Sequence, residues 1–216
     1  MNWDSFAYLL RFSVQPGHRE DEKLDRLVRL CEEAAIDDVM FFINQEELNR
    51  GHLTLEETKP WLDVIAKGKE RLQAIGVTTS INPWTSIFPA DRGRTLRPSQ
   101  KFRLMTDPKG RTAAATACPL CETFRAYIAE MYAYYATLRP RILWVEDDFR
   151  FHNHTPLEWG GCFCDEHMRL FAERAGVAGL TREEFVQAVT APGEPHPYRR
   201  IWLDANREAL VFLAAT

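Results

Sequence analysis

Hydrophobic and polar positions follow two periods along the chain, one typical of strands and one typical of helices. Short apolar runs rich in β-forming residues occur at residues 6–14, 38–43, 77–81 and 141–148. Apolar residues recur at helical spacing at residues 19–35, 54–75, 122–138 and 166–175. A strand followed by a helix, repeated four times, predicts a parallel sheet with helices packed on it.

Local signals mark where several of the helices begin. Thr54 is followed three residues later by Glu57, and Thr181 is followed by Glu184 at the same spacing. A threonine and a glutamate three residues apart form a capping box, in which each side chain binds the other residue's backbone N–H. We therefore expect helices directly after Thr54 and Thr181, and a last helix from Arg199.

The strand ends carry most of the polar residues that could do chemistry. No glycine-rich phosphate loop follows any strand, which disfavours a nucleotide-binding doubly wound fold. Side chains able to form hydrogen bonds instead follow each strand, at Gln15 and His18, Asn44 to Glu46, Asn82 and Trp84, and Asp147 to His152. This distribution predicts an α/β fold of the (β/α)8 TIM-barrel type, which places its active site at the C-terminal ends of its strands.

The predicted barrel is incomplete in this chain. A full barrel of this kind takes about 250 residues, whereas 216 residues show only about the first four βα units. We expect a single N-terminal, partial barrel domain over residues 1–216, with a long irregular loop at 85–117. The last helix remains apolar almost to Thr216, so we expect it to pack on more protein: a second copy of the chain or a missing C-terminal half-barrel.

Composition excludes two classes of partner. The chain has 27 basic and 31 acidic residues and no lysine- or arginine-rich block, so neither nucleic acid nor an anionic membrane is expected to bind. No apolar run approaches the roughly 18 residues of a transmembrane helix. Residues 1–6 lack the features of a signal peptide. Five cysteines, an odd number, then predict reduced thiols and a cytoplasmic location.

Cysteine and histidine residues gather in two segments with metal-binding spacing. Cys162, Cys164 and His167 lie within six residues of one another, and either Cys118 or Cys121 could add a fourth ligand. Four sulfur and nitrogen ligands suit tetrahedral zinc, so we predict a structural Zn²⁺ that joins the two segments. The alternative without a metal is that these are reduced cysteines in loops and that His167 lies on the surface of a helix.

The cysteines also allow two other interpretations. Cys118 and Cys121 form a C-x-x-C pair at a helix start, where the helix dipole favours a redox-active thiolate. Residues 110–117 before them do not have the hydrophobic strand pattern of a thioredoxin-like site, which disfavours redox chemistry. Cys31 stands alone on the apolar face of a helix and is expected in the core.

Three consecutive acidic residues end the fourth predicted strand. Side chains alternate along a strand, so Glu146 and Asp148 should point to one side and Asp147 to the other. Carboxylates crowded inside a barrel repel each other, and one of them could keep its proton and act as a general acid. The alternative is a structural ion-pair cluster with Arg150. Trp84, Phe149 and Phe151 could provide a sugar-stacking surface, although each alone is more typical of a core.

These motifs resemble a known family. The segment from Lys101 to Arg174 is similar to the zinc-containing microbial β-galactosidases of the clan-A glycoside hydrolases. The similarity rests on residues 107–111, the Ala-Cys-Pro at 117–119, the run 144–149, and Cys162-Phe-Cys-x-x-His167 with the Arg-Leu-Phe that follows. The resemblance implies a (β/α)8 barrel, with Cys118, Cys162, Cys164 and His167 as zinc ligands.

The resemblance also implies catalytic roles. Asp148 stands where the family has its acid/base glutamate on strand four, and Asp147 stands in place of an asparagine. The family's nucleophile lies on strand seven, which this chain does not reach. Two departures stand out: His167 replaces a cysteine ligand, and Asp148 is one methylene shorter than glutamate, whereas retaining hydrolysis needs its carboxyls about 5–5.5 Å apart.

The sequence therefore predicts a glycoside hydrolase-like protein acting on O-glycosidic bonds, β-galactosidase-like and incomplete or inactive as this chain. Asp148 and Asp147 are the expected catalytic residues. The expected carbohydrate-binding residues are Asn44, Asn82, Trp84, Glu146 and Arg150. The alternative from another class is a non-catalytic, zinc-stabilised α/β module that binds carbohydrate or assembles with a partner.

Overall fold

The computed structural model describes residues 7–43, 51–84, 87, 91, 94–146, 149–151, 155–158 and 160–216. The chain forms two compact units. Unit 1 comprises Met1–Thr85 and Glu130–Glu146, and unit 2 comprises Ser86–Ala129 and Asp147–Thr216. That residues 1–216 form a single domain stays a prediction.

Unit 1 is built on a parallel sheet, as the sequence pattern predicts. Its strands are β1 (Leu9–Phe12), β2 (Asp38–Phe42) and β3 (Thr78–Asn82), in the order β1-β2-β3. In the parallel register Leu9 lies opposite Asp38, which lies opposite Thr78. The central strand β2 is buried over its whole length, which is typical of parallel sheets covered by helices.

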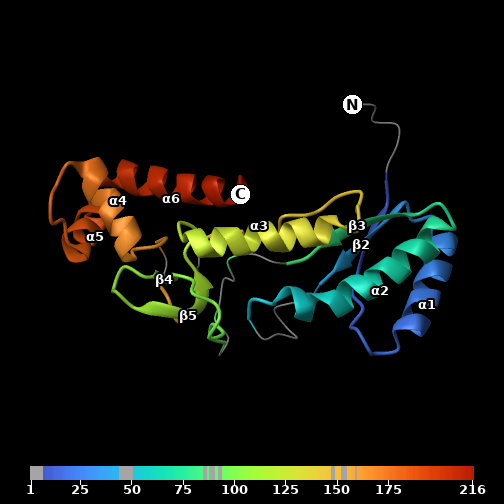
Figure 1. Cartoon of the computed structure of the whole chain (residues 1–216). Helices are drawn as coiled ribbons and strands as arrows, with labels where there is room; N and C mark the ends of the chain where they lie inside the picture. The colour runs from blue at the N-terminus through green and yellow to red at the C-terminus, as the bar shows by residue number, and fades with distance from the viewer. Residues whose placement is uncertain are drawn as a thin grey trace. The chain divides into compact units, whose positions relative to one another are not determined.

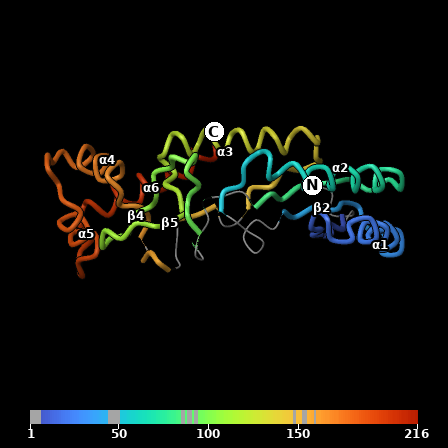
Figure 2. The backbone as a smooth tube through the Cα atoms, turned by 60° about the horizontal axis from the view of Figure 1, so that its bottom comes forward, coloured from blue at the N-terminus to red at the C-terminus, as the bar shows by residue number. Residues whose placement is uncertain are grey.

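Two helices connect the strands of unit 1 and lie side by side (Figures 1 and 2). They are α1 (Glu20–Glu33) and α2 (Leu55–Gln73). The predicted capping box at the start of α2 is confirmed, with reciprocal hydrogen bonds between Thr54 and Glu57. Gly68 lets α2 approach β2 closely, because a Cβ at this position would lie 2.5 Å from Cζ of Phe41.

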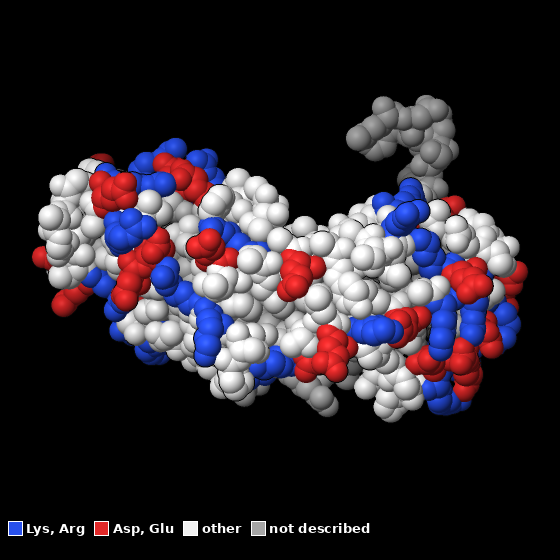
Figure 3. Space-filling model, in the orientation of Figure 1, with Lys and Arg blue, Asp and Glu red and all other residues white. Residues whose placement is uncertain are grey.

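Charges of both signs interleave over α1 and α2 (Figure 3). Arg71 bridges Asp21 and Asp25, and Lys67 pairs with Glu20 at 2.9 Å. Pairs this exposed contribute little to stability, typically about 0–1 kcal/mol each. Because the opposite charges alternate, this face has no extended patch of positive or of negative charge. This agrees with the nearly equal numbers of basic and acidic residues in the chain.

The fourth predicted strand is present only as a short extension of the sheet. Leu143 forms a parallel bridge with Ile81, supported by hydrogen bonds from Ile81 N–H to Ile142 O and from Trp144 N–H to Ile81 O. Within residues 141–146 the only strand pairing is the bridge at Leu143, so the expected strand over 141–148 is much shorter there. Residues 147 and 148 lie outside the described residues. In the described residues this segment has a strand neighbour on one side only, and one-sided parallel pairing is weak.

Unit 2 contains a hairpin where the sequence predicted an irregular loop. The antiparallel strands β4 (Leu104–Thr106) and β5 (Thr112–Ala117) lie inside residues 85–117, so that expectation was wrong in part. The turn between them is held by Asp107, whose carboxylate accepts the N–H groups of Lys109 and Arg111 and pairs with the Arg111 guanidinium at 2.7 Å. These contacts fix the turn that joins β4 to β5.

Asp91 stabilises β5 from its other side. The buried carboxylate of Asp91 accepts the backbone N–H groups of Ala114, Ala115 and Thr116 at 2.6–3.0 Å, and also the Thr116 hydroxyl. One side chain thus satisfies three backbone donors, and two of them, the N–H groups of Ala115 and Thr116, are buried and would otherwise lack acceptors.

Replacing Asp91 by Ala is expected to lower the free energy of unfolding by about 2 kcal/mol or more. The buried N–H groups of Ala115 and Thr116 would lose their charged acceptor, and each unsatisfied buried donor costs about 1–3 kcal/mol. Urea denaturation followed by circular dichroism measures the effect. Glu194→Ala, at an exposed position in the same unit, is the control and should change stability by less than about 0.5 kcal/mol. Equal stability of both variants would contradict this role of Asp91.

Helices make up the rest of the chain. They are α3 (Glu122–Ala136), which contains the boundary between the units, α4 (Asp165–Ala175), α5 (Arg182–Thr190) and α6 (Tyr198–Ala214). The second capping box is confirmed at Thr181 and Glu184. None of the described helices combines the length and apolar character needed to cross a membrane.

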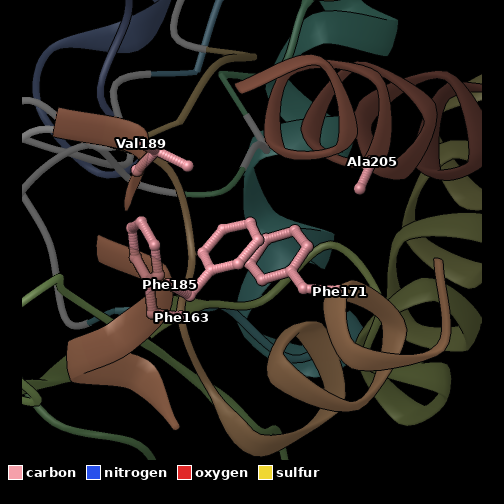
Figure 4. Close-up of a cluster of buried hydrophobic side chains, with 5 residues drawn as sticks. All are labelled: Phe163, Phe171, Phe185, Val189 and Ala205. Atoms are coloured by element: carbon pink, nitrogen blue, oxygen red, sulfur yellow. The ribbon is translucent and has the colours of Figure 1, made fainter. Parts of the chain in front are cut away.

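The core of unit 2 is aromatic (Figure 4). Phe171 of α4 and Phe185 of α5 stack face to face, with ring centroids 4.4 Å apart and planes at 3°. Phe163, from the loop before α4, packs edge-on to both rings. Ala205 of α6 belongs to the same buried cluster, so the core joins α4, α5 and α6 to the loop that carries the cysteines.

Candidate metal centre and strand-end site

Four of the predicted metal ligands lie together in unit 2. Cys118 directly follows β5, Cys162 lies in the loop before α4, Cys164 is the N-cap residue of α4, and His167 lies in the first turn of that helix. All four side chains are buried, and their ligand atoms lie within 4.8 Å of one another. They form a cluster that could bind a metal such as zinc.

Distances within the cluster fit a tetrahedral ion. Sγ of Cys164 lies 3.7 Å from Sγ of Cys118, and Nδ1 of His167 lies 3.4 Å from Cys118 Sγ and 3.6 Å from Cys164 Sγ. Tetrahedral bonds of about 2.3 Å to sulfur and about 2.0 Å to nitrogen would place the ligand atoms about 3.5–3.8 Å apart. Cys118, Cys164 and His167 therefore have the spacing of zinc ligands, and Cys162 lies within the 4.8 Å that encloses all four ligand atoms.

The histidine ring supports the same conclusion. His167 is fully buried between Phe151 and Phe171, its Nδ1 faces the sulfur atoms, and its Nε2 has no hydrogen-bond partner in the described part of the chain. Coordination through Nδ1 fixes the tautomer that carries a proton on Nε2. A buried imidazole turned toward three thiols is typical of a ligand, not of a core histidine.

The thiols of the cluster have pKa values that shift in opposite directions. Hydrogen bonds from the thiols of Cys118 and Cys162 hold the pKa of Cys164 well below its usual range. Burial raises the pKa of the Cys162 thiol. Metal ligation requires deprotonated sulfur, so a bound cation would favour the thiolate form of all three cysteines.

Neighbouring elements hold the cysteine loop in place. The N–H of Cys162 donates to Oδ1 of Asn206 on α6 at 3.3 Å, and the N–H of Phe163 donates to Thr106 O on β4 at 2.8 Å. Gly161 adopts a φ of 84°, and a Cβ there would lie 2.3 Å from Asn206 Oδ1. No sequence motif identified Asn206 or Gly161 as supports of the cluster.

The sequence spacing left either Cys118 or Cys121 as the fourth ligand, and the structure places Cys118 in the cluster. Sγ of Cys121 instead accepts the N–H of Arg103 at 3.1 Å and contacts the Thr123 hydroxyl. A strand does precede this C-x-x-C pair, contrary to the expectation for residues 110–117, but it belongs to an antiparallel hairpin. Cys31 is buried on α1, as predicted.

A second group of predicted residues meets at the strand ends of unit 1. Nδ2 of Asn82, at the end of β3, donates to Oε1 of Glu146 at 3.3 Å. Oδ1 of the same amide accepts the N–H of Trp84 at 3.1 Å, and Trp84 adopts a φ of 47°, which bulky residues rarely do. The structure therefore brings Asn82, Trp84 and Glu146 together.

Two residues of this cluster were missed from the sequence. Arg11 of β1 lies 3.8 Å from the Glu146 carboxylate, and its guanidinium stacks 3.7 Å above the Phe42 ring. Phe42 in turn lies 5.0 Å from the Trp84 ring. Arg11 comes from the first strand and Glu146 follows the fourth predicted strand, so this contact joins side chains from the two edges of the sheet.

The other residues predicted for catalysis or carbohydrate binding are not part of the strand-end cluster that the structure describes. Asn44, Asp147 and Asp148 lie outside the described residues. Arg150 is described, exposed, and belongs to unit 2. Its expected role beside the carboxylates, whether in sugar binding or in an ion pair, stays a prediction.

Comparison with known proteins gives a fold and no family. No protein-family model matches the chain, and no curated protein matches it. Among solved structures, the catalytic domain of β-amylase from Paenibacillus polymyxa matches 98% of this chain with a TM-score of 0.50 at 12% identity. A β-galactosidase from the psychrophilic Marinomonas ef1 matches 96% of the chain with a TM-score of 0.49 at 14% identity.

The fold is part of a TIM barrel. The chain covers 62% of the β-amylase domain and 36% of the β-galactosidase, so it spans less than two thirds of either. The α/β fold class predicted from the sequence is confirmed. At 12% identity the match to the β-amylase domain shows the fold alone. The buried Cys₃His cluster that the family resemblance implies is present in the structure.

Proposed function

We propose that the chain is part of a glycoside hydrolase-like protein acting on O-glycosidic bonds, with β-galactosides as the first substrates to test. The observation that carries the proposal is the strand-end cluster of Glu146, Asn82 and Trp84. TIM-barrel enzymes place their chemistry at these strand ends. A carboxylate and an amide can bind sugar hydroxyls, and an aromatic ring can stack on the apolar face of a pyranose.

Asp148 acts in this proposal as the general acid/base, and Asp147 positions the sugar. Both roles rest on the sequence and on its resemblance to the zinc-containing β-galactosidases. A general acid must hold a proton near neutral pH, which crowding with neighbouring carboxylates favours. Asn44 and Arg150 take carbohydrate-binding roles on the same grounds. The second carboxyl that glycoside hydrolysis requires would come from a strand outside those described.

The metal centre has a structural role. Three thiolates and one imidazole complete a tetrahedron, which leaves no position for water or substrate. A zinc ion bound there would cross-link the β4–β5 hairpin to the start of α4. The catalytic groups are carboxylates elsewhere in the chain.

Hydrolysis of p-nitrophenyl β-D-galactoside and related glycosides by the protein that contains this chain tests the proposal. Trp84→Ala should raise KM about 3–10-fold, since an aromatic contact is worth about 0.5–1.5 kcal/mol. Phe212→Ala, at an exposed aromatic residue of α6, should leave KM unchanged. A protein that neither hydrolyses nor binds any glycoside of the panel would overturn the proposal.

The second candidate function is a non-catalytic, zinc-stabilised module that binds carbohydrate or assembles with a partner. The buried Cys₃His cluster favours it, because a structural metal site would stabilise such a module whether or not the chain carries catalytic residues. Galactose binding without hydrolysis, detected by tryptophan fluorescence, would support this candidate over the enzyme.

A further inference from the structure

Arg11 and Glu146 place a hydrogen-bond donor beside an acceptor in the strand-end cluster of unit 1. Nη2 of Arg11 lies 3.8 Å from Oε1 of Glu146. Direct N–H···O hydrogen bonds extend to about 3.2 Å, so the two charged groups attract each other without such a bond. The separation leaves room for the hydroxyl groups of a ligand to bind to both groups.

The register of the sheet places Arg11 on the face that α1 and α2 do not cover. Phe41 packs against α2, and because side chains alternate along a strand, Phe42 projects to the opposite face. Arg11 lies opposite Met40, two residues before Phe42. Phe42 in turn lies opposite Asn82. Arg11, Phe42 and Asn82 therefore project from one face, near the C-terminal ends of three parallel strands.

The guanidinium of Arg11 is both oriented and accessible. Its Cζ lies 3.7 Å from the centroid of the Phe42 ring, so stacking holds the planar group in one direction. The Arg11 side chain is nevertheless 52% exposed. A guanidinium presents its N–H donors in a fixed fork, and an already oriented fork loses less conformational entropy when a ligand binds. Arg11 thus has the properties of a ligand-binding donor.

Glu146 supplies the matching acceptor. Its side chain is only 9% exposed, and Oε1 accepts a hydrogen bond from Nδ2 of Asn82 at 3.3 Å. A carboxylate this deeply placed needs a positive partner, which Arg11 provides. An ionised carboxylate only accepts hydrogen bonds, and a guanidinium only donates them. The pair therefore matches two hydroxyl groups, one that accepts from the guanidinium and one that donates to the carboxylate.

We propose that Arg11 and Glu146 together bind two neighbouring hydroxyl groups of one sugar ring. Arg11 donates to one hydroxyl and Glu146 accepts from the other, while Trp84, whose ring lies 5.0 Å from the Phe42 ring, contacts the apolar face of the sugar. The inference rests on the proposed function and deepens it by naming the class of sugar. Glycosides in which both hydroxyls are free should bind, and glycosides acetylated or methylated at either hydroxyl should not.

Monodeoxy sugars test the assignment one hydroxyl at a time. The affinities of methyl β-D-galactoside and its monodeoxy analogues for the protein that contains this chain are measured by titration calorimetry. Removing either bound hydroxyl should weaken wild-type binding about 10–100-fold, the effect of losing a hydrogen bond to a charged group. Arg11→Met should weaken binding of the parent sugar by a similar factor. In this variant, removing the hydroxyl that Arg11 binds should cost less than about 3-fold more, because that bond is already lost.

Glu146→Gln identifies the second hydroxyl. It should reduce the penalty for removing the hydroxyl next to the first one on the ring, because an amide oxygen accepts a weaker hydrogen bond than a carboxylate. Arg11→Lys keeps the positive charge beside Glu146 without the planar fork, and it should recover part of the affinity that Arg11→Met loses. Circular dichroism shows that the variants fold.

Arg26→Met is the matched control, because Arg26 is an exposed arginine of α1 that pairs with Glu22. It should leave every affinity unchanged. If each deoxy analogue loses as much affinity for Arg11→Met as for the wild type, the role of Arg11 is wrong while the proposed function stands. A wild-type protein that binds no sugar of the panel would contradict the proposed function and this inference with it.

Discussion

Replacing Cys162 and Cys164 together by Ser is expected to abolish zinc binding and to lower the Tm by at least about 10 °C. Two of four ligands would be lost from a buried cluster that joins the β4–β5 hairpin to the start of α4. Structural zinc contributes about 10–16 kcal/mol of apparent binding energy in zinc-finger peptides, and for a chain of this size each kcal/mol shifts the Tm by about 2–4 °C. Elemental analysis and calorimetry measure the two effects.

Two cysteines outside the cluster provide the controls. Cys31→Ser, on α1 in unit 1, and Cys121→Ser, whose sulfur bonds to the Arg103 N–H, should both retain about one zinc per chain, because the four ligands close one site. Chelation of the wild-type protein should reproduce the Tm of the double variant. Metal-free wild-type protein with an unchanged Tm would show that the cluster has no structural metal.

Asp148→Asn is expected to lower kcat for an aryl β-galactoside with a poor leaving group by about 10²–10⁴-fold. Asparagine keeps the size of the side chain and cannot donate or accept the catalytic proton. Activated leaving groups such as p-nitrophenol need less protonation, so the loss should be smaller for them. The wild-type rate should fall at high pH as the acid loses its proton, and this limb should be absent in the variant.

Asp147→Asn separates positioning from proton transfer. It should raise KM more than it lowers kcat, because asparagine can still bind a sugar hydroxyl. Asp165→Asn, at an exposed acid in the first turn of α4, controls for the loss of one charge. Equal rates for wild type and Asp148→Asn across the pH range would remove Asp148 from the mechanism.

Helices were predictable because their signals are local. The capping boxes at Thr54 and Thr181 and the apolar face of α3 need only residues within a few turns. Strand β5 was missed because its alanine-rich sequence carries no strand pattern. Asp91, more than twenty residues away in sequence, supplies the acceptors that hold it. Such contacts depend on the folded chain, and neighbouring residues do not encode them.

The candidate site residues also divide into those that local spacing predicts and those that only the folded structure reveals. The Cys162–His167 turn was evident from spacing, whereas the fourth ligand needed the geometry that separates Cys118 from Cys121. Arg11 was missed because a charged residue in a strand is typical of a solvent-facing position. Its guanidinium is half-exposed, and only the folded sheet shows that it lies 3.8 Å from Glu146.

X-ray absorption at the zinc edge tests the central structural claim most directly. If Cys118, Cys162, Cys164 and His167 hold the metal, the spectrum should fit three sulfur atoms at about 2.3 Å and one imidazole nitrogen at about 2.0 Å. His167→Cys should convert it to four sulfur atoms with the metal retained. Four sulfur atoms in the wild type, or a coordination sphere of oxygen and nitrogen alone, would contradict the assignment.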